Sequence, residues 1–417
     1  MEFQRTLALK GTSRLINLQD ILAARERIRG HVAVTPCPFS RPFSDLCGAQ
    51  IHFKLENLQR TGSFKERGAA NKLALLTPEE RARGIVAASA GNHAQGVAVN
   101  AQRLGIQATI VMPETTPLIK AQATKSFGAK VVFFGTSLAD AFVEARRIEK
   151  EQGAVFIHAF DDDAIIAGQG TAGLEILEQV PDVDVVVGSI GGGGWLGGIA
   201  VAVKAMKPSV RVVGVESALV QKMRAALDAG APVLVPAAST LADGIAVSQA
   251  GDRTLPLFTR YVDEIVCVDD EEVANAILLL IEKEKTVAEG AGAAPAAALL
   301  QHKLKGLRPA LKVVCVISGG NIDVNLLARI IERGLVKEGR RVMLAVRVPD
   351  RPGMLASILQ VVAVERANVL EVHHNRAFLA GPVGDTEIDL TLETRGADHI
   401  ESLIATLSSR GFKVTRR

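Results

Sequence analysis

Short runs of β-branched residues alternate with longer amphipathic stretches over most of the chain, from about residue 20 to residue 331. The runs at 84–88 and 108–112 have the length and composition of buried strands, whereas the stretches at 93–104 and 170–179 have helical spacing. Strands and helices that alternate in this way are typical of βα units around a mainly parallel sheet. The pattern therefore predicts an α/β fold for this part of the chain.

The C-terminal part has a different order of elements. Alternating hydrophobicity predicts four strands and helical spacing predicts two helices, at residues 342–348, 352–366, 368–378, 385–394, 398–410 and 412–415. The resulting order, βαββαβ, is that of a ferredoxin-like module. We place the boundary near Gly339, with the larger domain at 1–335 and the module at 340–417, and interpret the charged segment 332–341 as a linker.

Length and charge exclude several classes of protein. A chain of 417 residues is too long for one small domain and corresponds to two or three domains. Its 48 basic and 45 acidic residues give a net charge of only +3, so nothing favours binding to nucleic acid or to an anionic membrane. The uncharged run at 185–203 is long enough to span a bilayer, but its seven glycines make it a poor helix, and we reject a transmembrane segment.

Charges at Glu2 and Arg5 leave no room for the apolar stretch of a signal peptide. The four cysteines lack metal-binding spacing and are expected to be free thiols in a reducing compartment, which indicates a cytoplasmic protein. Composition adds one positive indication. The chain has 38 glycines against 14 Phe, one Tyr and one Trp, which raises the question of where its backbone approaches a ligand closely.

Four segments combine glycine with polar side chains where a strand gives way to a helix. The first places Lys65 after a glycine–serine turn, and the alternative for such a residue is an ordinary exposed lysine. The second, Ser89-Ala90-Gly91-Asn92-His93, follows the 84–88 strand. The backbone N–H groups of such a turn suit a carboxylate, whereas the alternative is a plain turn with Asn92 as a helix cap.

The third segment is Gly191-Gly192-Gly193-Gly194, between a buried strand and an apolar helix. Glycine N–H groups at a helix start form a nest suited to one terminal phosphate. A dinucleotide fingerprint is the rival interpretation, but the acidic residue expected at the second strand end is absent, and a flexible loop without a ligand is the remaining alternative. The fourth segment, 316–321, contains Ser318 at a strand end, where the alternative is a turn that closes the sheet.

These segments, in this order, resemble the pyridoxal-phosphate enzymes of the tryptophan-synthase-like fold (fold type II), and the resemblance covers about residues 21–325. It implies a two-lobed α/β enzyme with a small lobe at about 50–150 and with pyridoxal 5'-phosphate as the cofactor. It also implies that Lys65 is the catalytic residue, because the family's lysine at this position forms the Schiff base with the cofactor. Such a lysine must shed a proton, which desolvation and neighbouring cations favour.

The resemblance assigns further contacts to the cofactor. Phe64 would pack against the cofactor ring, Asn92 would contact the ring hydroxyl, and Glu289 would lie near the ring. The glycines 191–194 would hold the phosphate. Ser318 would bond the pyridine nitrogen, and because a neutral hydroxyl does not hold that nitrogen protonated, prompt loss of a β-hydroxyl is favoured over transamination.

For the substrate, the resemblance implies that the carboxylate binds the loop of Ser89, Ala90, Gly91 and Asn92, with His93 as a structural residue of the helix start. The chain is most similar to threonine dehydratases, with serine racemases as the nearest competitor. Racemases of this group place a second serine at position 90 as acid and base, but Ala90 cannot move a proton. Deamination of L-threonine, and of L-serine, to 2-oxobutanoate or pyruvate plus ammonia is therefore expected. The alternatives are a serine racemase, a hydroxyaspartate dehydratase and a non-catalytic amino-acid sensor.

The segment 348–355 resembles the start of an ACT domain, a regulatory module that commonly binds amino acids at a dimer interface. Gly353 lies at the strand-to-helix turn, where it lets a ligand approach the backbone. One hypothesis is an effector, such as isoleucine that inhibits and valine that relieves the inhibition, in an enzyme of isoleucine biosynthesis. The other is a pure oligomerisation module with constitutive activity. A homo-oligomer, dimer or tetramer, is expected.

A metal ion is not expected from the sequence. In racemase-like relatives a divalent cation lies near the segment equivalent to 216–222. Glu216 is present here, but Lys222 stands about where a second carboxylate is expected, and a hard cation needs several oxygen ligands.

Overall fold

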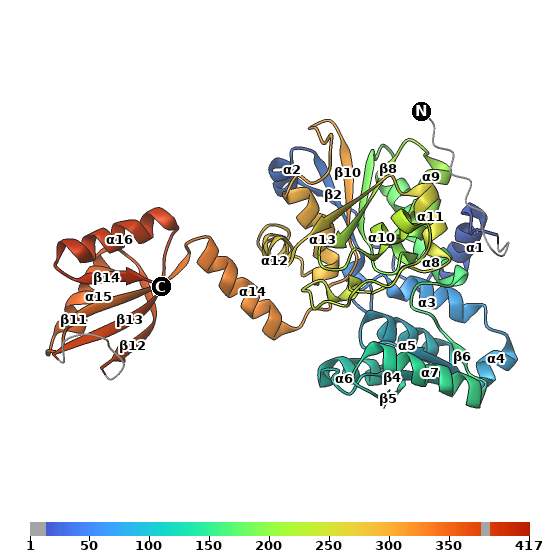
Figure 1. Cartoon of the computed structure of the whole chain (residues 1–417). Helices are drawn as coiled ribbons and strands as arrows, with labels where there is room; N and C mark the ends of the chain where they lie inside the picture. The colour runs from blue at the N-terminus through green and yellow to red at the C-terminus, as the bar shows by residue number, and fades with distance from the viewer. Residues whose placement is uncertain (1–13, 377–383) are drawn as a thin grey trace. The chain divides into compact units, whose positions relative to one another are not determined.

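The computed structural model describes residues 14–376 and 384–417, and the chain divides between Ile322 and Asp323 into two compact units (Figure 1). The first unit contains a six-stranded sheet and a four-stranded parallel sheet, each accompanied by helices. The second unit contains a four-stranded antiparallel sheet. The structure therefore confirms the α/β architecture with a separate C-terminal module.

The larger sheet of the first unit has the order β1-β2-β10-β7-β8-β9, in which β1 is antiparallel to β2 and the other pairs are parallel. Its central strands are rich in valine and buried, as expected where helices cover both faces of a parallel sheet. The bounds are β1 Phe39–Ser40, β2 Gln50–Leu55, β7 Val185–Ser189, β8 Arg211–Ser217, β9 Glu264–Val268 and β10 Lys312–Ile317.

The smaller sheet has the order β5-β4-β3-β6 and is parallel throughout. Its strands lie within residues 50–150, the range predicted for a small lobe, except for the short last strand at 155–156. The bounds are β3 Ile85–Ala88, β4 Ala108–Met112, β5 Lys130–Phe133 and β6 Val155–Phe156.

Recognisable caps start several helices of the first unit. Ser137 and Asp140 form a capping box at α7, and Asp269 and Glu272 form one at α12. Within the described part of the chain, no helix is both long and apolar enough to cross a membrane. The helices are α1 Leu18–Ile28, α2 Arg41–Cys47, α3 Lys65–Ala74, α4 Pro78–Arg83, α5 Asn92–Leu104, α6 Leu118–Ser126, α7 Leu138–Gln152, α8 Asp163–Gln179, α9 Gly194–Met206, α10 Lys222–Ala229, α11 Thr254–Tyr261, α12 Asp270–Leu279 and α13 Gly290–Leu300. Shorter turns are η1 Glu56–Leu58, η2 Asp243–Ile245 and the π-helical η3 Leu280–Glu284.

Helix α8 is longer than the sequence pattern predicts, because it begins at Asp163 rather than near Gly170. Glycines usually weaken a helix, but here they allow neighbouring helices to approach closely. A Cβ atom on Gly168 would lie 2.7 Å from the carbonyl oxygen of Arg67 in α3, and one on Gly198 of α9 would lie 2.4 Å from that of Ile166. Tertiary packing therefore explains glycines that local propensity counts against a helix.

The second unit has the predicted βαββαβ order, and helices α15 and α16 share one hydrophobic core with the sheet. Its sheet order is β12-β13-β11-β14. Helix α15 begins two residues later than predicted, at Met354, because Gly353 is its N-cap with a positive φ of 89°. The segment interpreted as a linker is helical up to Lys337. The bounds are α14 Val324–Lys337, β11 Arg341–Pro349, α15 Met354–Val364, β12 Asn368–Asn375, β13 Asp385–Glu393, α16 Ala397–Ser409 and β14 Lys413–Arg416.

A buried group of four charged side chains joins α3 to the larger sheet and to α8. Arg67 of α3, only 1% exposed, donates to both carboxylate oxygens of Glu56 at 2.8 Å and to Glu175 of α8 at 2.6 and 2.7 Å. Lys54 of β2 donates to the same Glu175 at 2.5 Å. Burial alone would raise the pKa of Glu56, but the Arg67 guanidinium holds that pKa below its usual value. The four charges therefore neutralise one another in the interior.

We expect Arg67→Met to destabilise the protein by about 3–5 kcal/mol, because it leaves Glu56 and Glu175 buried without their main counter-charge. Chemical denaturation measures the loss. Arg25→Met is the control, since Arg25 of α1 pairs with Glu178 of the same helix α8 in solvent, and its loss should cost less than about 1 kcal/mol. Equal losses for the two variants would contradict this role of Arg67.

Candidate active site

The predicted site residues lie where helices of the first unit begin. Lys65 is the first residue of α3, Asn92 the first of α5 and Gly194 the first of α9, while Glu289 is the N-cap of α13. The first N–H groups of an α-helix have no partner within the helix, so such starts attract anions and polar ligands. Helices α5 and α9 follow strands β3 and β7, in agreement with the strand–turn–helix context predicted from the sequence.

Backbone hydrogen bonds bring the Lys65 segment against the segment that contains Ser318. The N–H of Phe64 donates to the carbonyl of Ser318 at 3.0 Å, and the N–H of Gly320 donates to the carbonyl of Gly62 at 2.9 Å. These bonds form an antiparallel bridge between Ser63 and Gly319, separate from the parallel pairing of β2 and β10. Two segments separated by more than two hundred residues in the sequence thus form one wall of the site.

Lys65 has the electrostatic surroundings of a reactive amine. Its Nζ donates to the carbonyl oxygen of Ala159 at 2.8 Å. Desolvation lowers the pKa of Lys65 to about 8, and the carboxylate of Glu289 acts in the opposite direction. A much larger fraction of this amine is therefore neutral near pH 8 than of an ordinary exposed lysine.

Glu289 is the carboxyl that acts on Lys65, and burial shifts its own pKa in the opposite direction. The residue is 6% exposed, and burial raises the pKa of its carboxyl to about 7, while a hydrogen bond from Asn92 Nδ2 at 2.7 Å counteracts the shift. Asn321 donates in turn to Asn92 Oδ1 at 2.7 Å and to the carbonyl of Thr61 at 2.7 Å. The chain from Asn321 through Asn92 to Glu289 fixes the orientation of the Asn92 amide.

The four glycines 191–194 form a loop that is packed tightly on its outer side. A Cβ atom on Gly192 would lie 2.3 Å from the ring of Phe160, and one on Gly194 would lie 2.5 Å from the carbonyl oxygen of Phe160. Gly193 has a positive φ of 98°, and its Cβ would lie 2.7 Å from Met223. Only glycine fits these three positions, and the loop presents backbone groups at the start of α9. This geometry suits a phosphate.

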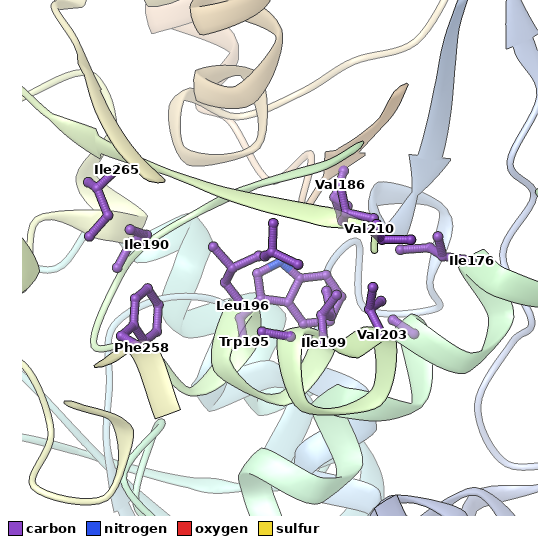
Figure 2. Close-up of a cluster of buried hydrophobic side chains, with 14 of the residues drawn as sticks. Ile176, Val186, Ile190, Trp195, Leu196, Ile199, Val203, Val210, Phe258 and Ile265 are labelled. Carbon is purple, nitrogen blue, oxygen red and sulfur yellow. The ribbon is translucent and has the colours of Figure 1, made fainter. Parts of the chain in front are cut away.

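Phe64 stacks on Trp195, with ring centroids 4.2 Å apart and an angle of 25° between the planes. Figure 2 shows Trp195, Ile199 and Val203 of α9 facing Val186 and Val210 in the core of the first unit. The ring of Phe64 is also 5.2 Å from Lys65 Nζ. The contact of Phe64 with a cofactor ring stays a prediction, whereas its stacking on the helix that follows the glycine loop was not predicted.

The loop predicted for the substrate carboxylate is open on one side. Gly91 is the N-cap of α5, its N–H donates to Ser89 Oγ at 3.2 Å, and a Cβ atom on Gly91 would meet nothing within 4 Å. His93 is 4% exposed, and its Nε2 lies 3.0 Å from the carbonyl oxygen of Ile157. Burial, followed by the charge of Lys65, lowers the pKa of His93 to about 3, in keeping with a structural role.

Three other predicted residues lie outside this group of contacts or at its edge. Ser318 is buried, with its Oγ 3.4 Å from Ser189 Oγ. Glu216 is buried beside Lys222, and the described residues contain no cluster of His, Cys, Asp and Glu that would hold a metal ion. Gly353 belongs to the second unit, where it is the N-cap of α15.

Sequence reasoning missed several residues that the structure places at the site. Asn321 closes the fourth segment, 316–321, and its position in that motif was a usable signal. Ala159 and Phe160 contribute a carbonyl oxygen to Lys65 and a ring to the glycine loop, and these contacts have no signature in the sequence. Thr254 holds the loop from outside, with its hydroxyl donating to the carbonyl of Gly192 at 2.7 Å.

An amine with a lowered pKa, a loop that only glycine can form and a buried Ser63 hydroxyl without a partner among the described residues fit a phosphorylated aldehyde cofactor. Residues 28–319 match the family described as pyridoxal-phosphate dependent enzymes, and residues 337–410 match the ACT domain. The chain therefore belongs to the pyridoxal-phosphate dependent enzymes, with an ACT domain in its C-terminal part. This confirms the predicted cofactor and fold.

Several individual proteins that this chain resembles are named for reactions of threonine or serine. The L-threonine ammonia-lyase of Thermotoga maritima is 50% identical over 401 residues, which cover 96% of this chain and 99% of that protein. The catabolic L-threonine dehydratase of Escherichia coli is 45% identical over 315 residues, covering 76% of this chain and 96% of that protein. Among solved structures, maize serine racemase has a TM-score of 0.73 at 33% identity and covers 78% of this chain and 100% of its own.

We expect the apo protein to bind pyridoxal phosphate at Lys65 with a rate that rises with pH and is half-maximal near pH 8, because the neutral amine is the reactive form. In Glu289→Gln the midpoint should move to lower pH, since the carboxylate that favours the charged amine is gone. Stopped-flow absorbance of the bound cofactor measures both midpoints. A wild-type midpoint above pH 10, the range of an ordinary lysine, would show that Lys65 is not desolvated.

Proposed function

We propose that this chain deaminates L-threonine, and also L-serine, to 2-oxobutanoate or pyruvate plus ammonia. The observation that carries the proposal is the pairing of Lys65, with a pKa lowered to about 8, and Glu289, with a pKa raised to about 7, beside a glycine loop suited to a phosphate. The identity to an L-threonine ammonia-lyase over nearly the whole of both chains supports threonine as the substrate.

Bound pyridoxal 5'-phosphate supplies an electron sink that makes the α-proton of an attached amino acid acidic. Lys65 would hold the cofactor, and its amine would take the α-proton of the amino acid. The lowered pKa of Lys65 makes this amine available as a base near neutral pH. The carboxylate of Glu289 raises the pKa of Lys65, so it favours the ammonium that forms when Lys65 takes the proton.

The remaining site residues bind and orient. The N–H groups at Gly191, Gly192, Gly193 and Gly194 would hold the phosphate, and Ser318 would bond the pyridine nitrogen. Asn92, oriented by Asn321 and Glu289, would contact the ring hydroxyl. The open loop of Ser89, Ala90 and Gly91 takes the carboxylate of the amino acid at the start of α5.

A serine racemase is the second candidate, favoured by the solved structure of the maize enzyme. Racemisation requires a group that delivers a proton to the face of the α-carbon opposite Lys65. The methyl group of Ala90 cannot carry that proton. The identity is also lower, 33% against 50% for the ammonia-lyase. Deamination is therefore the better supported reaction.

For the C-terminal part we propose a regulatory role, with a catalytic domain at 1–335 and an ACT domain at 340–417. An amino-acid effector would bind near Gly353, whose positive φ and open surroundings leave the backbone accessible. Isoleucine as inhibitor is the hypothesis to test first, because it is the end of the route that 2-oxobutanoate would feed. We also propose a cytoplasmic homo-oligomer, dimer or tetramer.

We expect Lys65→Ala to lose the visible absorbance band of the bound cofactor and to form 2-oxobutanoate from L-threonine roughly a thousandfold more slowly or not at all, since it has neither the covalent link nor the base. Lys72→Ala is the matched control, because Lys72 lies on the same helix but pairs with Asp162 in partial contact with solvent. D-serine formed from L-serine faster than pyruvate by the wild type would favour the racemase instead.

We expect a chain that ends at Glu338 to keep its rate on L-threonine and to lose any inhibition by isoleucine. The 315 residues aligned with the E. coli dehydratase make up 96% of that protein but only 76% of this chain. That relative has little room for an additional domain, which supports a catalytic part that does not require the ACT domain for chemistry. Initial rates with and without isoleucine for the two lengths test this. Inhibition that survives the truncation would place the effector site in the first unit.

A further inference from the structure

Lys222 is a fully buried lysine that the roles above do not use. It begins helix α10, and its side chain is 0% exposed. Its Nζ donates to the carbonyl oxygen of Ile190 and, at 3.0 Å, to that of Ile245, and it lies 3.2 Å from Glu216 Oε1. Glu216 is also fully buried, at the end of β8. A charged side chain in this position requires an explanation, because burying it is costly.

The surroundings of Lys222 Nζ match an ammonium group. An ammonium has three N–H donors, and three oxygen atoms, from Ile190, Ile245 and Glu216, lie around the nitrogen. A neutral amine would direct its lone pair at one of these oxygens. Burial lowers the pKa of Lys222, and the carboxylate of Glu216 opposes that shift. The N–H groups of Met223 and Arg224 donate to Glu216 at 2.9 and 3.1 Å, which holds the carboxylate in place.

The carbonyl of Ile190 is significant because it belongs to the same peptide group as the N–H of Gly191. In a trans peptide the C=O and the N–H point in opposite directions. A carbonyl held by Lys222 on one side of the loop therefore directs the Gly191 N–H to the other side. The second carbonyl, of Ile245, ends the η2 turn, whose Gly244 oxygen would lie 3.5 Å from a Cβ atom on Gly191.

We propose that Lys222 is a positioning residue of the glycine loop: its ammonium group holds the Ile190 carbonyl so that the Gly191 N–H faces the phosphate of the cofactor. This inference rests on the proposed role of the loop in phosphate binding. Lys222 also ties the loop to η2 and to the end of β8, so the loop is held in its binding conformation before the cofactor arrives. Its effect is on the phosphate end of the cofactor and not on the aldehyde end at Lys65.

The test compares the affinities of pyridoxal phosphate and of pyridoxal, which lacks the phosphate, in the full-length apo protein. Absorbance of the bound aldehyde and fluorescence of Trp195, the only tryptophan, report binding. We expect Lys222→Met to weaken pyridoxal phosphate by roughly tenfold or more and to leave pyridoxal almost unchanged, because only the phosphate contacts depend on the Ile190 carbonyl. A similar loss for both compounds, or no loss for either, would overturn the positioning role.

Two further variants keep the test decisive. Lys222→Met combined with Glu216→Gln removes both buried charges, so if the single variant does not fold, the double variant should fold and still lose the preference for the phosphate. Lys303→Ala is the control for the loss of a lysine, because Lys303 bonds a carboxylate at 2.6 Å and a carbonyl at 2.8 Å, both of residues outside the glycine loop, with its side chain 29% exposed. If the wild type binds both compounds with equal affinity, the glycine loop does not bind the phosphate. The positioning role of Lys222, which rests on that binding, is then wrong as well.

Discussion

The buried charge group around Arg67 is the interaction on which the position of helix α3, which begins at Lys65, depends. Arg67 lies two residues after Lys65, and its guanidinium is held by Glu56, next to the larger sheet, and by Glu175 of α8. Charges that neutralise one another inside a protein tolerate little displacement, since each separated charge would be left without solvent. The start of α3 is therefore held at a defined distance from the strands and helices that carry the rest of the site.

The site itself relies on two physical devices. Helix starts present backbone N–H groups that suit an anion, and glycines let the loop at the start of α9 pack closely against Phe160, as the overlaps at Gly192 and Gly194 demonstrate. Burial provides the reactivity, because it lowers the pKa of Lys65 and raises that of Glu289 toward the same range. An amine with a lowered pKa is available as a base near neutral pH, which suits a reaction that starts by removing a proton.

Much of the fold and part of the site could be predicted from the sequence. The strands, the βαββαβ module and the glycine loop have strong local signatures, namely β-branched runs, alternation and four consecutive glycines. The start of α8 could not be predicted, because its glycines are required by close contacts with α3 and α9. The contacts of Lys65 with Ala159 and of Phe64 with Trp195 could not be predicted either, because they join segments far apart in the chain.

The sequence by itself determined the fold class and the order of the motifs, because these depend on residue types at short spacing, and the resemblance of those motifs to a known family implied the class of cofactor. Only the tertiary structure decided how the motifs act on one another. It assigned Asn321 to orient Asn92, and it placed the ammonium of Lys222 behind the glycine loop. The physical reason is that pKa shifts, hydrogen-bond orientation and close packing depend on distances across the fold, and a pattern along the chain contains no such distances.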